Sequence, residues 1–234
     1  MSRLISRGIW DCRLQLRNGF YYAAIAVAGM LTGVLAWVPQ GQTVWILPVA
    51  LLGNLVTNGF YFMAAIVLLE KAEHSLEAQF VTPLRAWEYL VARVASLCFL
   101  SLAESVAIVA IAYKGSVDWS VLALGVVLMT SVLACCGFLL VARYESINEF
   151  LFPSFVVSVL LSLPLLNLLD LWPSTIWYLH PLHASLELIR AGFEPLPLVQ
   201  LGSAVVIAIV WITALSIPCA RGFRRFVAGG LPTA

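Results

Sequence analysis

Residues 69–90, with the sequence LEKAEHSLEAQFVTPLRAWEYL, form a long charged segment between two apolar runs that are each long enough to cross a membrane. On a helix, four polar side chains recur at i, i+3, i+4 and i+7 and share one face: Glu70, Glu73, His74 and Glu77. Four apolar side chains line another face: Leu69, Ala72, Leu76 and Phe80. This pattern predicts a short amphipathic helix.

Pro83 places a corner after this helix. Proline disfavours a helical conformation in the residue before it and fits the first position of a helix, so Thr82 is expected to cap a new helix that begins at Pro83. Two interpretations of residues 70–89 follow. One is a solvated loop, which is the commoner explanation of a charge run, and the other is a docking element for another protein.

The composition is that of a membrane protein. Of the 234 residues, 62% are hydrophobic and 11% are charged, whereas soluble domains carry about 25% charged residues. Since a helix needs about 20 apolar residues to cross a bilayer, the sequence predicts an all-α membrane protein of a single domain, residues 1–234, with six transmembrane helices. These spans are expected near 20–38, 44–69, 91–113, 121–141, 150–169 and 199–219.

Basic residues predict the orientation of the spans. Six crossings put both termini on one side of the membrane, and that side then holds eleven of the 13 basic residues, leaving only Lys114 and Arg190 opposite. Because cytoplasmic loops carry the excess of Lys and Arg, the termini, residues 70–89 and the loop at Arg143 are expected to be cytoplasmic in the cell membrane. A net charge of +1 gives no basic field for a nucleic-acid partner.

Two further segments lie outside the predicted spans. Residues 1–18 carry Arg3, Arg7, Arg13 and Arg17 beside apolar positions, which is typical of an interfacial helix, with a plain basic tail as the alternative. Residues 170–198 are rich in Pro, Trp and His and include a candidate short helix at 182–190 that ends before Gly192. Trp172, Trp177 and Tyr178 favour a place for this segment at the outer membrane surface.

The sequence contains no motif for covalent chemistry. It has no GxxxxGK[ST] phosphate loop, HExxH or GxSxG, and its five cysteines show no CxxC spacing. His183 and Glu187, with His180 nearby, have a spacing that zinc accepts, but no further ligand is evident and polar capping at a wet interface is preferred. The chain itself is therefore not expected to be an enzyme or to bind a metal or cofactor. Any ATP and Mg would be bound by another chain.

Polar residues inside the predicted spans are candidates for a substrate cavity. Asn54, Thr57, Asn58 and Tyr61 recur along one face of the second span, where they either join helices or line a cavity. Glu104 lies within the third span, where a carboxylate usually faces a partner or water. It would either attract a cationic or zwitterionic substrate or share a proton with the asparagines as a neutral acid.

Small residues mark two packing faces. Gly29 and Gly33 are four residues apart in the first span, and Ser154, Ser158 and Ser162 repeat at the same interval in the fifth. Small residues let another helix approach closely. The partner helix belongs either to the same chain or to a second copy.

Several stretches resemble type-2 ABC transporter permeases, and more narrowly the fluoroquinolone-export-type permease subunits. They are LEKAEHSLEA at 69–78, VTPLRAWEYL at 81–90, VARYESINEF at 141–150 and WYLHPL at 177–182. Members often have Asn before the proline at position 181, so His180 is a departure.

The resemblance implies that residues 70–89 are a cytoplasmic coupling segment that lies on a separate ABC ATP-binding subunit. It assigns this role to eight residues: Glu70, Glu73, His74, Glu77, Phe80, Thr82, Pro83 and Arg85. It also implies short outer helices between spans five and six, and a second permease subunit, identical or paralogous. In the family that the chain resembles, two permease subunits pair through their first and fifth spans. The resemblance therefore assigns Gly29, Gly33, Ser154 and Ser158 to the dimer interface.

These observations predict an export permease that is powered by a separate ATPase. Its cargo would be a small amphipathic or apolar molecule, such as a fluoroquinolone, and Asn54, Asn58, Tyr61 and Glu104 would line the cavity that holds it. The alternative is a proton- or ion-coupled secondary transporter that uses Glu104. A membrane enzyme is a weaker alternative, because acidic, His and Ser groups do not gather at one membrane face.

Overall fold

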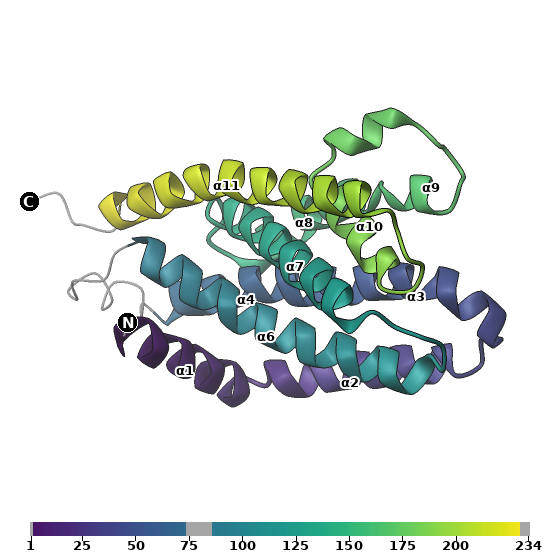
Figure 1. The fold of residues 1–234 in the computed structure, drawn as a ribbon. Coiled ribbons are helices and arrows are strands. Elements are labelled where there is room, and N and C mark those ends of the chain that lie inside the picture. The colour runs from purple at the N-terminus through teal and green to yellow at the C-terminus, as the bar shows by residue number, and fades with distance from the viewer. Residues whose placement is uncertain (1, 74–85, 230–234) are drawn as a thin grey trace, which may run out of the picture.

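A computed structural model describes residues 2–73 and 86–229 (Figure 1), and within them every regular element is a helix. The all-α fold is thereby confirmed. The elements include a π-helix, η1, and a 3-10 helix, η2. In chain order they are α1 (Ser2–Arg17), α2 (Phe20–Leu35), α3 (Gln40–Leu55), η1 (Val56–Tyr61), α4 (Phe62–Ala72), α6 (Ala86–Ala112), α7 (Trp119–Val141), α8 (Ile147–Ser162), α9 (Leu165–Leu168), η2 (Thr175–Leu179), α10 (His183–Ala191) and α11 (Leu198–Gly229).

Five helical stretches within the described residues are long and apolar enough to cross a membrane, and α1 and α2 supply a sixth if this bent pair is one span. The five are Gly41–Ala72, Trp87–Ala112, Trp119–Val141, Ile147–Leu168 and Leu198–Phe223. They coincide with the second to sixth predicted spans. The start of α1, the end of α4, the start of α6 and the end of α11 lie at one end of the molecule (Figure 1).

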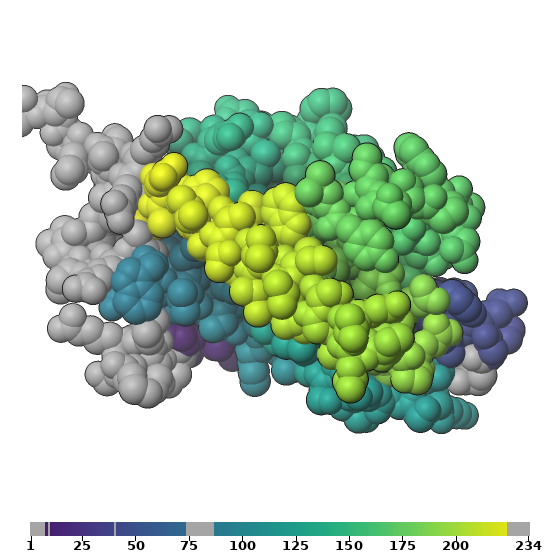
Figure 2. All heavy atoms as spheres, turned by 45° about the horizontal axis from the view of Figure 1, so that its top comes forward, coloured from purple at the N-terminus to yellow at the C-terminus, as the bar shows by residue number. Residues whose placement is uncertain are grey.

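Helix α7 forms the centre of the bundle. It packs against α10, α11, η1 and α6, and its side chains Val126, Met129, Val132 and Leu133 are fully buried. In contrast, α8 and α11 leave most of their apolar windows exposed, and Figure 2 shows α11 lying across one face of the molecule. Their apolar surfaces match a bilayer, or another membrane subunit, as surroundings.

Two glycines allow α7 and η1 to touch through their backbones. A Cβ atom added to Gly137 would lie 2.5 Å from the carbonyl oxygen of Phe60, and one added to Gly59 would lie 2.8 Å from the Cβ of Leu133. No larger residue fits either position without moving one helix. The π-helix is therefore held tightly against the central helix.

The segment between α8 and α11 contains the predicted short helix. Helix α10 spans His183–Ala191 and ends at Gly192, in agreement with the expected 182–190, and it packs between α7 and α11. Trp172 and Tyr178 are exposed, as expected for the membrane interface. Trp177 instead is buried, and its Nε1 donates a hydrogen bond to the carbonyl oxygen of Trp172 at 2.9 Å.

Helix α1 is separate from the first span. The axes of α1 and α2 differ by 70°, and the chain turns at Gly19, whose φ of 82° lies in the left-handed region that glycine adopts without strain. If α2 crosses the membrane, α1 lies close to the membrane plane. This geometry fits the expected interfacial helix.

The predicted orientation can be tested by cysteine labelling. In a cysteine-free background, single cysteines at positions 114 and 190 are expected to react with an impermeant thiol reagent in intact cells. A cysteine at 143 should react only after permeabilisation, because Arg143 belongs to the cytoplasmic set of basic residues. Labelling of position 143 in intact cells would contradict the six-span orientation.

Candidate functional site

A buried ionic cluster, the Arg93 cluster, joins three helices and consists of Asp11, Glu70, Tyr89 and Arg93. The Arg93 guanidinium donates through Nη2 to Glu70 Oε1 and lies 3.4 Å from Asp11 Oδ1. The Tyr89 hydroxyl donates to the other carboxylate oxygen of Glu70 at 2.6 Å, and the Tyr89 ring lies against the guanidinium at 5.2 Å. All four side chains are buried, so the charges are shielded from solvent.

The Arg93 cluster fastens the two ends of the segment that the sequence singled out. Glu70 is on α4, just before residues 74–85, and Arg93 is on α6, just after them. Asp11 adds α1, and Gln15 Nε2 supplies a second link from α1 by donating to Ser96 Oγ on α6 at 2.8 Å. These contacts therefore hold α1, α4 and α6 together.

The structure changes the expected role of Glu70. Because Glu70 is 2% exposed and paired with Arg93, it does not belong to an exposed acidic face. Glu73 follows the end of α4 and is exposed. The other six expected coupling residues lie outside the described residues: His74, Glu77, Phe80, Thr82, Pro83 and Arg85.

Lys71 connects the same end of α4 to the loop between α7 and α8. Its Nζ donates to the carbonyl oxygen of Tyr144 at 2.6 Å and lies 3.6 Å from Glu145 Oε1. The loop at Arg143 is thus joined to the second span next to residues 74–85. Two separate polar contacts, through Glu70 and Lys71, act on the last turn of α4.

A second polar site, the Glu104 cluster, lies inside the bundle and consists of Asn54, Asn58 and Glu104. Both asparagine amides donate to Glu104 Oε2, Asn54 at 2.9 Å and Asn58 at a shorter distance. Glu104 is 6% exposed and the asparagines 1%. Because Asn54 and Asn58 are four residues apart, both reach the same carboxylate from one helix face.

Tyr61 does not join the Glu104 cluster. Its hydroxyl donates to Ser158 Oγ on α8 at 3.1 Å, and Thr57 bonds back to the carbonyl of Gly53. The π-helix from Val56 to Tyr61 has a wider turn than an α-helix, so the expected single face of four polar residues is divided. Short π-helices within longer α-helices are frequent at functional sites.

The Glu104 cluster has unused capacity to accept hydrogen bonds. Among the described residues, none donates to Glu104 Oε1 or to the Oδ1 atoms of Asn54 and Asn58. The buried hydroxyls of Ser101 and Ser105 on α6 also have no partner there. Such oxygens suit a cationic or hydrogen-bond-donating group, or a proton on the carboxylate.

The small residues of the first and fifth spans face different surroundings. Gly29 and Gly33 are exposed, and a Cβ atom added to either would meet no atom within 4 Å. Ser154 is buried within the chain, and Ser158 accepts the hydrogen bond from Tyr61. The glycines therefore lie on an outer face, whereas Ser154 is buried within the chain and Ser158 contacts the second span.

The two outer histidines make local contacts. His180 Nε2 lies 3.2 Å from the carbonyl oxygen of Leu160, and His183 Nε2 lies 3.0 Å from Asn167 Nδ2. Burial, with a smaller effect of the neighbouring His180, lowers the pKa of His183 to about 4. At neutral pH, His183 is therefore uncharged and joins α10 to α9.

Comparison with known proteins identifies the kind of molecule that carries these clusters. The fluoroquinolones export permease protein family matches residues 2–230. The chain belongs to this family. Two fluoroquinolones export permease proteins of Mycobacterium tuberculosis, from strains CDC 1551 / Oshkosh and ATCC 25618 / H37Rv, are each 30% identical to it over 230 residues, which is 97% of this chain and of each relative.

Family membership confirms the resemblance found in the sequence. Together with the apolar helices, it makes the chain a multi-pass membrane protein with a permease role. Both clusters lie within the part of the chain that matches the export permease family.

The Arg93 cluster is not among the sites predicted from the sequence, although two of its features are visible there. Tyr89 and Arg93 are four residues apart at the start of an apolar run, so both face one side of α6. Asp11 is the one acidic residue among the four arginines of residues 1–18. The sequence shows the spacing of residues within each helix, but it does not show that the three helices contact one another at these residues.

The Arg93 cluster predicts a large effect of removing the central cation. Arg93→Met would leave two buried carboxylates without this positive charge, a change that costs about 3–5 kcal/mol. Thermal unfolding of the purified protein in detergent is expected at a clearly lower temperature. Arg143→Met, at an exposed position, is the control and should unfold like the wild type; equal melting of both variants would contradict a structural role for Arg93.

The Glu104 cluster predicts a role for negative charge in transport. Glu104→Gln keeps the size and one hydrogen-bond acceptor but removes the charge, so transport is expected to change while membrane insertion and yield do not. Glu104→Leu tests packing instead. Rates measured over a range of pH in vesicles would decide: a Gln variant that transports every substrate like the wild type at each pH would leave Glu104 only a helix-joining role.

Proposed function

We propose that the chain is the membrane-spanning subunit of an ATP-driven ABC exporter and that residues 70–89 couple it to a separate ATP-binding subunit. The observation that carries the proposal is the Arg93 cluster, which joins both flanks of this segment to α1 in a chain of the export permease family. A force applied to the segment would move three helices as one unit. ATP and Mg would belong to the partner, since the sequence has no phosphate-binding loop.

The proposed cargo is a small amphipathic molecule, with a fluoroquinolone as the first candidate because the two relatives bear that name. A fluoroquinolone carries a basic amine and a carboxylate on an aromatic body. The unpaired oxygens of the Glu104 cluster suit the ammonium group. Because Glu104 is buried, α3 and α6 would have to move apart around Asn54 before cargo could reach it.

The proposed complex contains two permease subunits, identical or paralogous. The exposed faces of α2 around Gly29 and Gly33 and of α8 around Phe152 and Phe155 are suited to a second membrane subunit. Both spans keep most of this apolar surface outside their own bundle. In the proposed orientation the termini and the ATP-binding subunit are cytoplasmic.

A proton- or ion-coupled secondary transporter is the second candidate, and the buried carboxylate of Glu104 favours it. It would need neither residues 70–89 nor an ATPase. The two candidates differ in what drives export from sealed vesicles. Transport that requires ATP and survives collapse of the ion gradients supports the ABC exporter, whereas the reverse supports the secondary transporter.

Charge reversal within residues 70–89 tests the coupling proposal. Glu73→Lys with Glu77→Lys is expected to leave the protein inserted but to abolish substrate-stimulated ATP hydrolysis and export. Reversed charges at a docking surface add repulsion and can cost several kcal/mol, whereas on a solvated loop they cost little. The measurements are binding of the purified ATP-binding subunit and ATP hydrolysis in detergent.

The matched control places the same charge change on the predicted outer side, with Asp170→Lys and Glu194→Lys. A cytoplasmic ATPase does not reach these positions, so its affinity should equal that of the wild type. If the Glu73/Glu77 variant also binds and transports like the wild type, residues 70–89 are an ordinary loop and the docking proposal fails.

A further inference from the structure

A groove opens between the N-terminal helix and the first and third spans. It has a volume of about 590 Å³ and lies between α1, the start of α2 and the first half of α6. Its wall is mainly apolar and includes Leu16, Tyr21, Ala95 and Phe99. A volume of this size lies within the range of small-ligand sites, and its lining suits an acyl chain.

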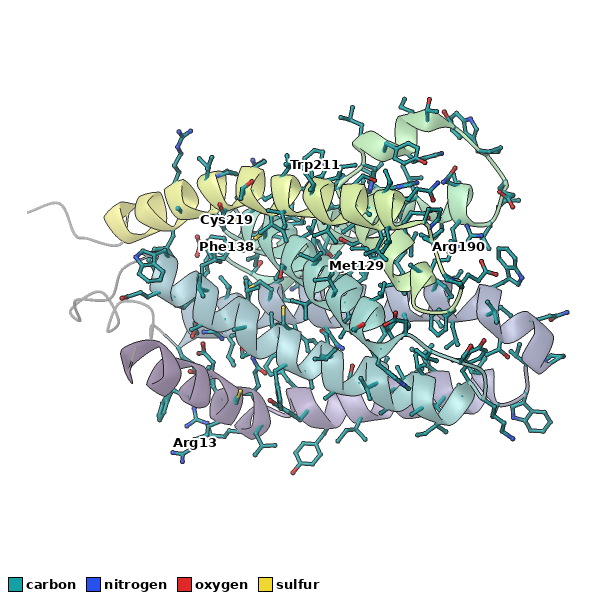
Figure 3. All side chains as sticks on the ribbon, in the orientation of Figure 1. Arg13, Met129, Phe138, Arg190, Trp211 and Cys219 are labelled. Atoms are coloured by element: carbon teal, nitrogen blue, oxygen red, sulfur yellow. The ribbon has the colours of Figure 1, made fainter. Side chains whose placement is uncertain are left out.

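Arg13 is the charged residue at this groove. It lines the groove and is exposed, and Figure 3 shows its side chain pointing away from the bundle. Among the described residues, no carboxylate pairs with Arg13 and none lines the groove. The guanidinium is therefore available to an anion from outside the chain.

The bend at Gly19 bears on the depth of the groove in a bilayer. If α2 crosses the membrane, α1 lies close to the membrane surface because it turns 70° away from α2, and the groove is at headgroup depth. Tyr21 and Phe99 belong to the helices that then enter the bilayer. An apolar wall that runs into the bilayer from a basic rim has the shape and charge of a phospholipid site. Next to the groove, α1 contacts α6 through Asp11 and Gln15, and Ser96, the partner of Gln15, lines the groove.

We propose that this groove binds one anionic phospholipid, with its phosphate on Arg13 and an acyl chain along Leu16, Tyr21 and Phe99. A zwitterionic lipid fits less well, because no carboxylate lines the groove to pair with its ammonium group. The lipid would contact α1 and α6 in the groove, next to the contacts that the Arg93 cluster makes between the same two helices. Lipid binding would thus steady the helix that is fastened to both flanks of residues 74–85.

The test uses the full-length protein and two lipids, phosphatidylglycerol and phosphatidylcholine, with bound lipid counted by native mass spectrometry. The wild type is expected to retain about fivefold more phosphatidylglycerol than phosphatidylcholine, which is the ratio that one arginine near an anionic lipid provides. Arg13→Gln should bring this ratio close to one. Arg17→Gln is the matched control, since Arg17 is exposed on the same helix but does not line the groove, and it should keep the ratio of the wild type.

A third variant tests the acyl-chain part of the site. Ala95 is exposed in the groove wall, so Ala95→Trp fills the groove without changing charge or core packing and is expected to displace both lipids. Equal retention of the two lipids by the wild type would overturn the proposal. So would an equal loss of selectivity in the Arg13 and Arg17 variants, or full lipid retention by Ala95→Trp.

Discussion

The buried guanidinium of Arg93 is the constraint on which the arrangement of the N-terminal half depends. Charges taken out of water need partners close by, and the partners of Arg93 come from α1 and α4, far apart in the sequence. If α1 or α4 moved away from Arg93, the guanidinium would lose a buried partner of opposite charge, and so would the carboxylate on that helix. The three helices are therefore held in one relative position more firmly than apolar side chains alone would hold them.

The Glu104 cluster follows a different rule from the Arg93 cluster. Arg93 meets two carboxylates and a tyrosine, so opposite charges are paired in its cluster, whereas Glu104 meets only neutral amides on one of its oxygens. The first cluster ties helices together through charge, and the second leaves one carboxylate oxygen without a donor among the described residues. This difference is why Glu104, and not Arg93, is the group proposed to meet cargo or a proton.

The membrane spans could be predicted from the sequence because hydropathy depends only on local composition. Five of the six apolar runs recur as long helices at nearly the same positions, and α10 occupies the predicted place. The direction in which polar side chains point was harder to predict from the sequence. Glu70 has the spacing of an exposed stripe yet is buried, because its partner Arg93 comes from another helix. Tyr61 meets Ser158 of α8 rather than the asparagines, because it belongs to a π-helix, whose turn is wider.

The shallow burial of α11 has a consequence for biosynthesis. Only 11% of its apolar window is buried within the chain, and it follows the other described spans in the sequence. The central helix α7 already contacts η1, α6 and α10 in the preceding part of the chain. Much of the described interior can thus form from helices that are synthesised before α11, which then packs along α7 and α10.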